Sequence, residues 1–138
     1  MATASGEAPI TVTMRVPMAA VAAGSDLTSP IGRVPFAGTV TGVRYIPTSV
    51  LTGADTNSRT LNVYNRKSDN SGTTVVATKA YTAGQNIAAN TAGTVPLSGT
   101  AANLDVAAGD VLDFESLHIG GTGLADPGGL VEVDVLKA

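Results

Sequence analysis

Short runs in which apolar and polar residues alternate are the feature that most restricts the fold of this chain. The clearest run is residues 10–16, where Ile10, Val12, Met14 and Val16 alternate with two threonines and an arginine. Successive side chains of a β-strand point to opposite faces, so a spacing of two is typical of a strand with one buried face. Further strand-like runs are predicted at residues 38–46, 59–65, 73–82, 94–98, 103–106, 111–117 and 130–136.

The segments between these runs are rich in turn residues. The chain has 16 glycines and 7 prolines. Residues 66–72, RKSDNSG, predict a hairpin, and Pro47 ends the predicted strand 38–46. Residues 17–30 are predicted to pass from an extended stretch into a loop that contains Pro30, with a short helix over residues 18–23 as the alternative.

No long helical period separates the runs. Eight or nine short strands without helices predict an all-β fold, a single antiparallel β-sandwich with jelly-roll or Greek-key-like connections. Residues 1–8 are small, polar and unpatterned, so we expect a flexible N-terminal arm. Residues 9–138 then form the one β-sandwich domain, which is long enough to bury a core without disulfides; the chain has no cysteine.

Composition excludes several classes of function. Charged residues make up 14% of the chain, against a usual share of about 25%. The net charge is −3, and Arg66-Lys67 is the only adjacent basic pair, so we expect no nucleic-acid partner. The most apolar window, residues 16–24, is too short to cross a membrane, and residues 1–10 lack a secretory pattern. We therefore expect assembly in the cytoplasm and burial of the weakly charged surface against a partner.

The stretch with the most titratable side chains is residues 104–120, LDVAAGDVLDFESLHIG. Gly109 and Asp110 predict a tight turn, with a strand before it and a second strand from residue 111. On the second strand Leu112 and Phe114 share the core face. Asp113 and Glu115 share the opposite face, where we expect them to keep the strand solvated.

Catalysis is the competing interpretation of these acids. Asp113 and Glu115 could form a carboxylate pair, but a glycosidase pair usually lies in an aromatic-lined cleft, and this chain has two Phe, three Tyr and no Trp. His118, the sole histidine, has no nucleophile-elbow sequence to serve, and we place it in a loop or at a rim. We expect no catalytic residues and no enzymatic activity.

Ligand sites are the second alternative. Asp55 and Asp126 lie in loops suited to Ca²⁺, although no calcium-loop sequence is present. The glycine-rich residues 120–129 lead into a strand and lack the Lys-Ser/Thr of a phosphate loop. We therefore predict no cofactor and no metal site, with a structural Ca²⁺ as the open alternative.

Four segments, taken in order, resemble small structural proteins of tailed bacteriophages. They are TVTGVRYIP, TGADTNSRTLNVYNRKSDNSGTTVVA, ANLDVAAGDVLDFES and GTGLADPGGLVEVDV, within residues 38–136. The resemblance implies a head decoration (cement) or capsid fibre protein, a β-sandwich that binds the major capsid protein on the outside of an icosahedral shell. It implies no catalytic residues. A tail, baseplate or receptor-binding fibre component is the alternative.

The N-terminal part of the chain is the expected contact with the shell. We predict that residues 1–16 are most engaged with it, and that Glu7, Pro9, Ile10, Val12 and Met14 are the capsid-contact residues. Symmetric positions on a shell recruit symmetric oligomers, so we expect a homotrimer at three-fold positions, with a dimer at two-fold positions as the alternative.

Overall fold

The computed structural model describes residues 8–138, and in these residues the chain is all-β with antiparallel sheets. The prediction of an all-β antiparallel fold is confirmed. No α-helix occurs in this part of the chain; the one helical element is the 3₁₀ turn η1 (Ala101–Leu104). The strands are β1 (Thr11–Met18), β2 (Leu27–Arg33), β3 (Gly38–Pro47), β4 (Leu51–Thr52), β5 (Ser58–Asn65), β6 (Thr74–Tyr81), β7 (Asn86–Ile87), β8 (Gly93–Thr94), β9 (Asp105–Val106), β10 (Val111–Ile119) and β11 (Gly129–Lys137).

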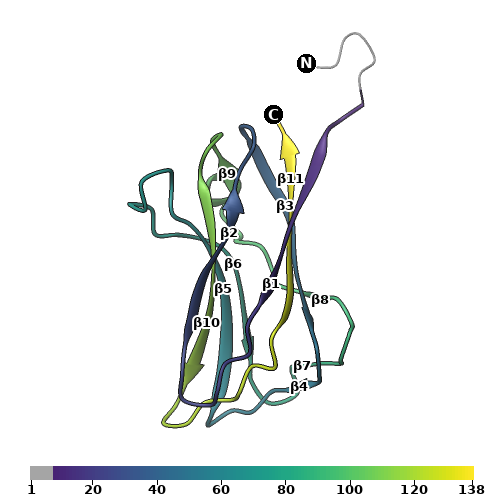
Figure 1. Ribbon diagram of the computed structural model, residues 1–138, viewed down its shortest axis with the longest axis vertical. Coiled ribbons are helices and arrows are strands. Elements are labelled where there is room, and N and C mark those ends of the chain that lie inside the picture. Colours follow the sequence, from purple (N-terminus) through teal and green to yellow (C-terminus); the bar gives the residue numbers. More distant parts are fainter. Residues whose placement is uncertain (1–7) are drawn as a thin grey trace.

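Two larger sheets account for most of these strands, and Figure 1 shows them facing each other. One has the order β1-β11-β3-β8, with β9 also paired to β3; the other has the order β2-β10-β5-β6. Strands β4 and β7 form a separate short pair. Strands distant in sequence therefore lie side by side, as β1 and β11 do.

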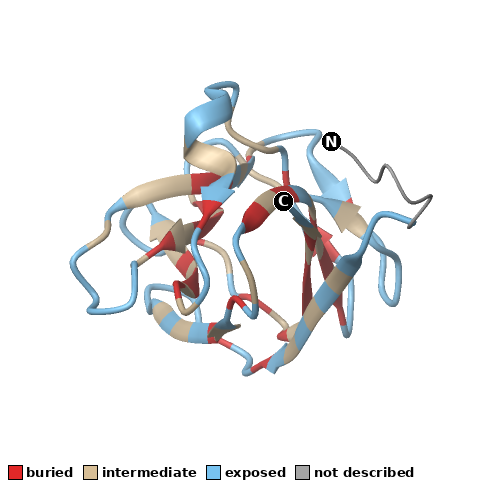
Figure 2. Ribbon diagram, turned by 90° about the horizontal axis from the view of Figure 1, so that it is seen from above, coloured by how far each residue is buried: buried red, intermediate tan, exposed pale blue. Residues whose placement is uncertain are grey.

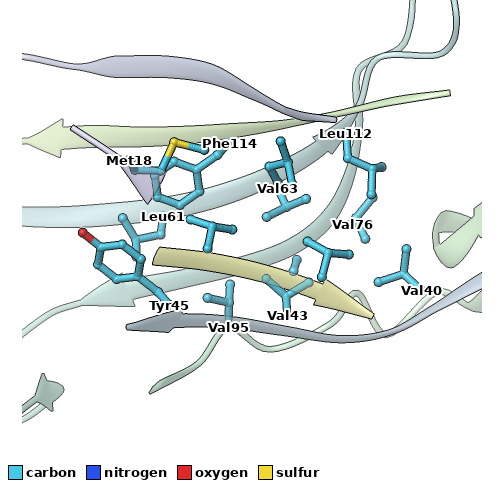
Figure 3. Packing of buried hydrophobic residues seen from close by; sticks show 14 of the residues in the cluster. Met18, Val40, Val43, Tyr45, Leu61, Val63, Val76, Val95, Leu112 and Phe114 are labelled. Atoms are coloured by element: carbon cyan, nitrogen blue, oxygen red, sulfur yellow. The ribbon is translucent and has the colours of Figure 1, made fainter. Parts of the chain in front are cut away.

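The hydrophobic core lies between the inner faces of the two sheets (Figure 3). Leu112 and Phe114 are 0% and 1% exposed, so the predicted core face of the second acidic-stretch strand is confirmed. The rings of Phe114 and Tyr45 stack with centroids 5.8 Å apart. Valine dominates the remaining core positions, because its branched side chain packs well on a pleated surface.

Strand β1 has the alternating burial that its sequence predicts. Figure 2 shows it as alternating exposed and intermediate residues, and the pattern ends at the buried Met18. The helix considered over residues 18–23 does not form; Val21 instead makes an isolated antiparallel bridge with Asp126. The turns predicted at Gly109 and in residues 66–72 are also present. Gly109 has φ +88°, and Lys67 and Asn70 have positive φ.

Strand β2 corrects the sequence interpretation of residues 17–30 as a loop. The loop ends at residue 26, and Pro30 lies inside the strand, opposite Asp113 of β10. Proline is tolerated here because β2 is the edge strand of its sheet and pairs on one side only. The predicted strand over residues 103–106 is also shorter than expected, because Leu104 belongs to η1. Residues 8–138 form eleven strands, more than the predicted eight or nine, because β2 and the two-residue strands β4 and β7 were not predicted.

Candidate functional site

The two acids of β10 point to the outer face, as predicted, but they do not simply solvate it. The carboxylate of Asp113 forms an ion pair with Arg66 (Nε–Oδ2 3.0 Å) and is 8% exposed as a residue. The Oε1 atom of Glu115 accepts hydrogen bonds from Asn62 Nδ2 (2.9 Å) and from the Tyr64 hydroxyl (3.1 Å). The expectation that these acids keep the strand solvated is therefore wrong for Asp113, which is buried. Glu115 links β10 to β5, and Asp113 links β10 to the residue that follows β5.

His118 lies on the other face of β10, away from these two acids. It is a strand residue near the end of β10, so the loop placement is wrong, although it does lie at a rim. Its Nδ1 lies 2.6 Å from Asp26 Oδ1, which also accepts the His118 backbone N–H at 2.8 Å. These hydrogen bonds, the backbone one first, lower the pKa of Asp26 below its usual value. The acids and the imidazole do not converge on one position.

Asp126 is buried at the end of the core, with both carboxylate oxygens engaged by the fold. Its Oδ1 accepts the hydroxyl of Tyr45 and the backbone N–H of Gly128 (2.9 Å), and its Oδ2 accepts the hydroxyl of Ser116 (2.6 Å). Burial, followed by the hydrogen bond to Asp126, raises the pKa of Tyr45 well above its usual value. Asp126 thus ties the 120–128 loop to strands β3 and β10.

Arg59 extends this network and is fully buried. Its guanidinium donates to the backbone carbonyl oxygens of Leu124 (2.6 Å), Ser25 (3.0 Å) and Ala22 (3.3 Å), and to both oxygens of Ser116. Burial lowers the pKa of Arg59, and the nearby charge of Asp126 opposes that shift. The guanidinium therefore fixes two loops to the end of the core.

The sequence interpretation missed this network, although one signal was present. Arg59 lies an even number of residues from Leu61 and Val63, so it is on the same face of β5. The alternation that places those two residues inside therefore places Arg59 inside as well. Its acidic neighbour Asp126 follows β10 in the chain, and only the fold brings the two together.

The two aspartates considered as calcium ligands already accept hydrogen bonds from the protein. The oxygens of Asp126 accept protein donors, and Asp55, in another loop, accepts the backbone N–H of Ala83 at 2.9 Å. In residues 8–138 no group of three or more histidine and acidic side chains is placed to hold a metal. Residues 120–129 lead into β11, as expected, and not into a helix.

A charged ladder crosses the outer face of the other sheet. Glu132 on β11 lies between Arg15 of β1 (2.6 Å) and Arg44 of β3 (3.0 Å). Asp134 accepts two hydrogen bonds from Arg44 (2.8 and 3.0 Å) and one from the Thr13 hydroxyl (2.7 Å). Hydrogen bonds from Arg44 lower the pKa of both acids. The ladder is neutral in sum and holds the three strands in register.

The predicted capsid-contact residues divide into three groups. Glu7 lies outside the described residues. Pro9 and Ile10 are exposed, and Ile10 retains 49% of its surface. Val12 and Met14 face inward, and Met14 packs against the core. Because these two side chains point into the domain, a partner that binds beside them contacts the backbone of β1.

A shallow apolar hollow of about 410 Å³ lies beyond the ladder, between the ends of β1, β3 and β11. Pro17, Ile46 and Leu130 are among the apolar residues that line it, and Thr48 and Asn90 supply its polar side chains. No titratable side chain lines it, so it gathers no groups for acid–base chemistry.

The comparisons with known proteins add no assignment. No family model matches the chain, and no curated protein or solved structure matches it either. Within residues 8–138 there is no helix with the length and apolarity to span a membrane. The fold and the site define an all-β domain whose buried and paired polar groups support its own architecture.

Proposed function

We propose that this chain is a virion structural protein that binds the outside of a phage capsid and stabilises it by bridging capsomers. The proposal rests on one observation: the charged side chains considered as site residues bond to other groups of the same domain. Four charged side chains bond to partners within the domain: Asp113, Glu115, Asp126 and Arg59. We therefore expect the protein to act through its surfaces and not through a reactive centre. The resemblance of residues 38–136 to phage structural proteins supports the same function.

The weakly charged surface also supports it. Interfaces gain most of their energy from a water-excluded apolar centre and disfavour charged residues there. With 14% charged residues, and with Glu132 and Asp134 paired to arginines, the domain can be covered by neighbours at a small desolvation cost. The proposed partner is the major capsid protein, and the proposed location is the capsid surface.

We further propose that the two sheets form a β-sandwich of the jelly-roll type. Five pairings nest inside one another along the chain: β5 with β6, β3 with β8, β3 with β9, β2 with β10, and β1 with β11. Nested pairings describe one long hairpin. The additional pairs β11–β3 and β10–β5 are those expected when such a hairpin wraps into two sheets, the arrangement found in viral capsid domains.

We propose the number of copies from the symmetry expected of an icosahedral shell. A homotrimer at three-fold positions is favoured on that argument, with a dimer at two-fold positions as the alternative. Contact through residues 1–16 remains part of the proposal, with Pro9 and Ile10 as the exposed side chains of that segment.

The second candidate function is a tail, baseplate or receptor-binding fibre component. It predicts aromatic side chains in the loops at one end of the domain, ready to contact a receptor. The three tyrosines and Phe114 lie on strands, and Phe36, the one aromatic residue in a loop of residues 8–138, is half-buried against the core. This disfavours the second candidate.

Electron cryo-microscopy of the particle whose genome encodes the chain tests the proposal. We expect density for the domain on the head lattice, at capsomer junctions. Adding the purified chain to heads that lack it should raise the temperature at which the heads open, and the heat-denatured chain is the control. Density on the tail would support the second candidate, and absence from the particle would overturn both.

A further inference from the structure

Strand β1 has one paired edge and one open edge. The Lys137 N–H donates to the Ile10 carbonyl oxygen (2.8 Å), and the register places these two residues opposite each other. Bonding alternates along an antiparallel strand, so every second residue from Ile10 turns its backbone toward β11. Thr11, Thr13 and Arg15 turn their N–H and C=O groups the other way. Within residues 8–138, no backbone group bonds to these three.

The nearest element on that side is β2, and it does not occupy the open edge. It approaches β1 through the inner face, where a Cβ atom added to Gly32 would lie 3.0 Å from Met14 Cε. In the described chain β2 shares no backbone hydrogen bond with β1, and its one ladder is with β10. Residues Thr11, Thr13 and Arg15 are all exposed. Within residues 8–138 nothing covers the edge, which is thus accessible to a partner.

We propose that the β1 strands of two copies of this chain pair antiparallel about a two-fold axis at Thr13. Thr13 then faces Thr13 of the second copy, and Thr11 faces Arg15. Three bonded pairs supply about six backbone hydrogen bonds. The five-stranded sheet continues across the axis into the sheet of the second copy.

The inner faces of the two strands match in the same register. Ile10 falls opposite Val16 of the second copy, and Val12 falls opposite Met14. All four side chains are apolar. Ile10 is 49% exposed and the other three are half-buried, because nothing in the described chain covers them from the open edge. Pairing extends the core over them, which is the gain expected from apolar cross-strand neighbours.

Two prolines and one arginine favour this register over its neighbours. Pro9 and Pro17 come opposite each other at both ends, where neither has an N–H to offer, so the pairing stops after Ile10 and Val16. The Arg15 side chains of the two copies stand about 14 Å apart along the strands. A register centred on Met14 would bring them to about 7 Å along the strands and would set Pro17 against Thr11.

The second copy is a better occupant than an extended segment of another protein, because the hydrogen-bond, apolar and proline patterns of residues 9–17 are complementary to themselves. The inference is independent of the capsid role, since it concerns two copies in solution. A seven-residue contact is small for a protein interface, so the dimer should form reversibly with concentration.

An engineered thiol tests the axis directly, because the chain has no cysteine. Opposed residues of a bonded antiparallel pair have Cα atoms about 5.5 Å apart, within the range that a disulfide spans. Thr13→Cys should therefore give a disulfide-linked dimer on mild oxidation. The matched control is Thr28→Cys, an exposed threonine on the edge strand β2, which should stay monomeric.

Sedimentation of the purified full chain over a range of concentrations gives the second measurement. The wild-type chain should show a reversible monomer–dimer equilibrium. Thr13→Pro should weaken it at least tenfold and leave the far-UV circular dichroism unchanged, because the Thr13 N–H does not face β11. A wild-type chain that stays monomeric, or a Thr13→Cys variant that cross-links no better than Thr28→Cys, overturns the proposal. A dimer that survives Thr13→Pro also overturns it, and pairing seen only when a capsid peptide is added assigns the edge to another protein.

Discussion

Replacing Asp126 with alanine tests the buried network at the end of the core. The change removes the acceptor of two buried hydroxyls, Tyr45 and Ser116, and the acid whose charge most offsets the burial of Arg59. A buried donor left without a partner costs about 1–3 kcal/mol. Leaving a buried charge such as that of Arg59 without its compensating acid costs about 3–5 kcal/mol. These costs overlap, so we expect Asp126→Ala to lower the free energy of unfolding by about 3–5 kcal/mol, a large part of the about 5–15 kcal/mol of a typical domain.

Asp126→Asn separates the charge from the hydrogen bonds. The amide oxygen can still accept from Tyr45 and Gly128, and its nitrogen can donate to Ser116, so we expect a cost of about 1–3 kcal/mol. Urea unfolding followed by circular dichroism and tyrosine fluorescence measures both variants; Asp105→Ala, at an exposed position, is the control and should change stability by less than about 0.5 kcal/mol. A cost below about 1 kcal/mol for Asp126→Ala would refute the reasoning, as would equal costs for the two Asp126 variants.

The remaining predictions concern the core, the outer acids and the ladder. Phe114→Ala should lower the free energy of unfolding by about 3–5 kcal/mol in the same urea titration, and a cost typical of a surface residue would contradict its core position. The double change Asp113→Ala, Glu115→Ala should leave attachment to phage heads intact in a co-sedimentation assay, and loss of attachment by a folded variant would revive a site there. The lowered pKa of Glu132 means that its contribution to stability is complete above its unfolded value near 4.5 and is lost as the pH falls through its folded pKa. Thermal melts below pH 4.5 should therefore show a smaller loss of stability in Arg44→Ala than in the wild-type chain; equal losses would contradict this.

Local alternation was enough to predict which side of each strand is buried. It placed Leu112 and Phe114 in the core, gave β1 its two faces, and set Asp113 and Glu115 on the outer side of β10. These assignments need only the period of two within one strand. The all-β class followed in the same way, from several such strands without a helical period.

Contacts between strands could not be predicted, because they depend on register. Asp113 was expected to be solvated because its partner, Arg66, lies across a strand pair that the sequence does not align. Strand β2 was missed for a related reason: Pro30 disfavours a central strand, and only the sheet order shows that β2 is at an edge. Arg59 was overlooked because a lone arginine favours the surface, whereas five acceptors from distant segments satisfy it inside.

The central position of β11 has a consequence for the order of folding. This strand follows every other in the chain, yet it lies between β1 and β3 and joins them. During synthesis β1 is therefore made long before β11, the strand with which it pairs. Such long-range closure is slow and leaves apolar ribbons unprotected in the meantime. The nascent polypeptide is accordingly prone to aggregation until β11 is made.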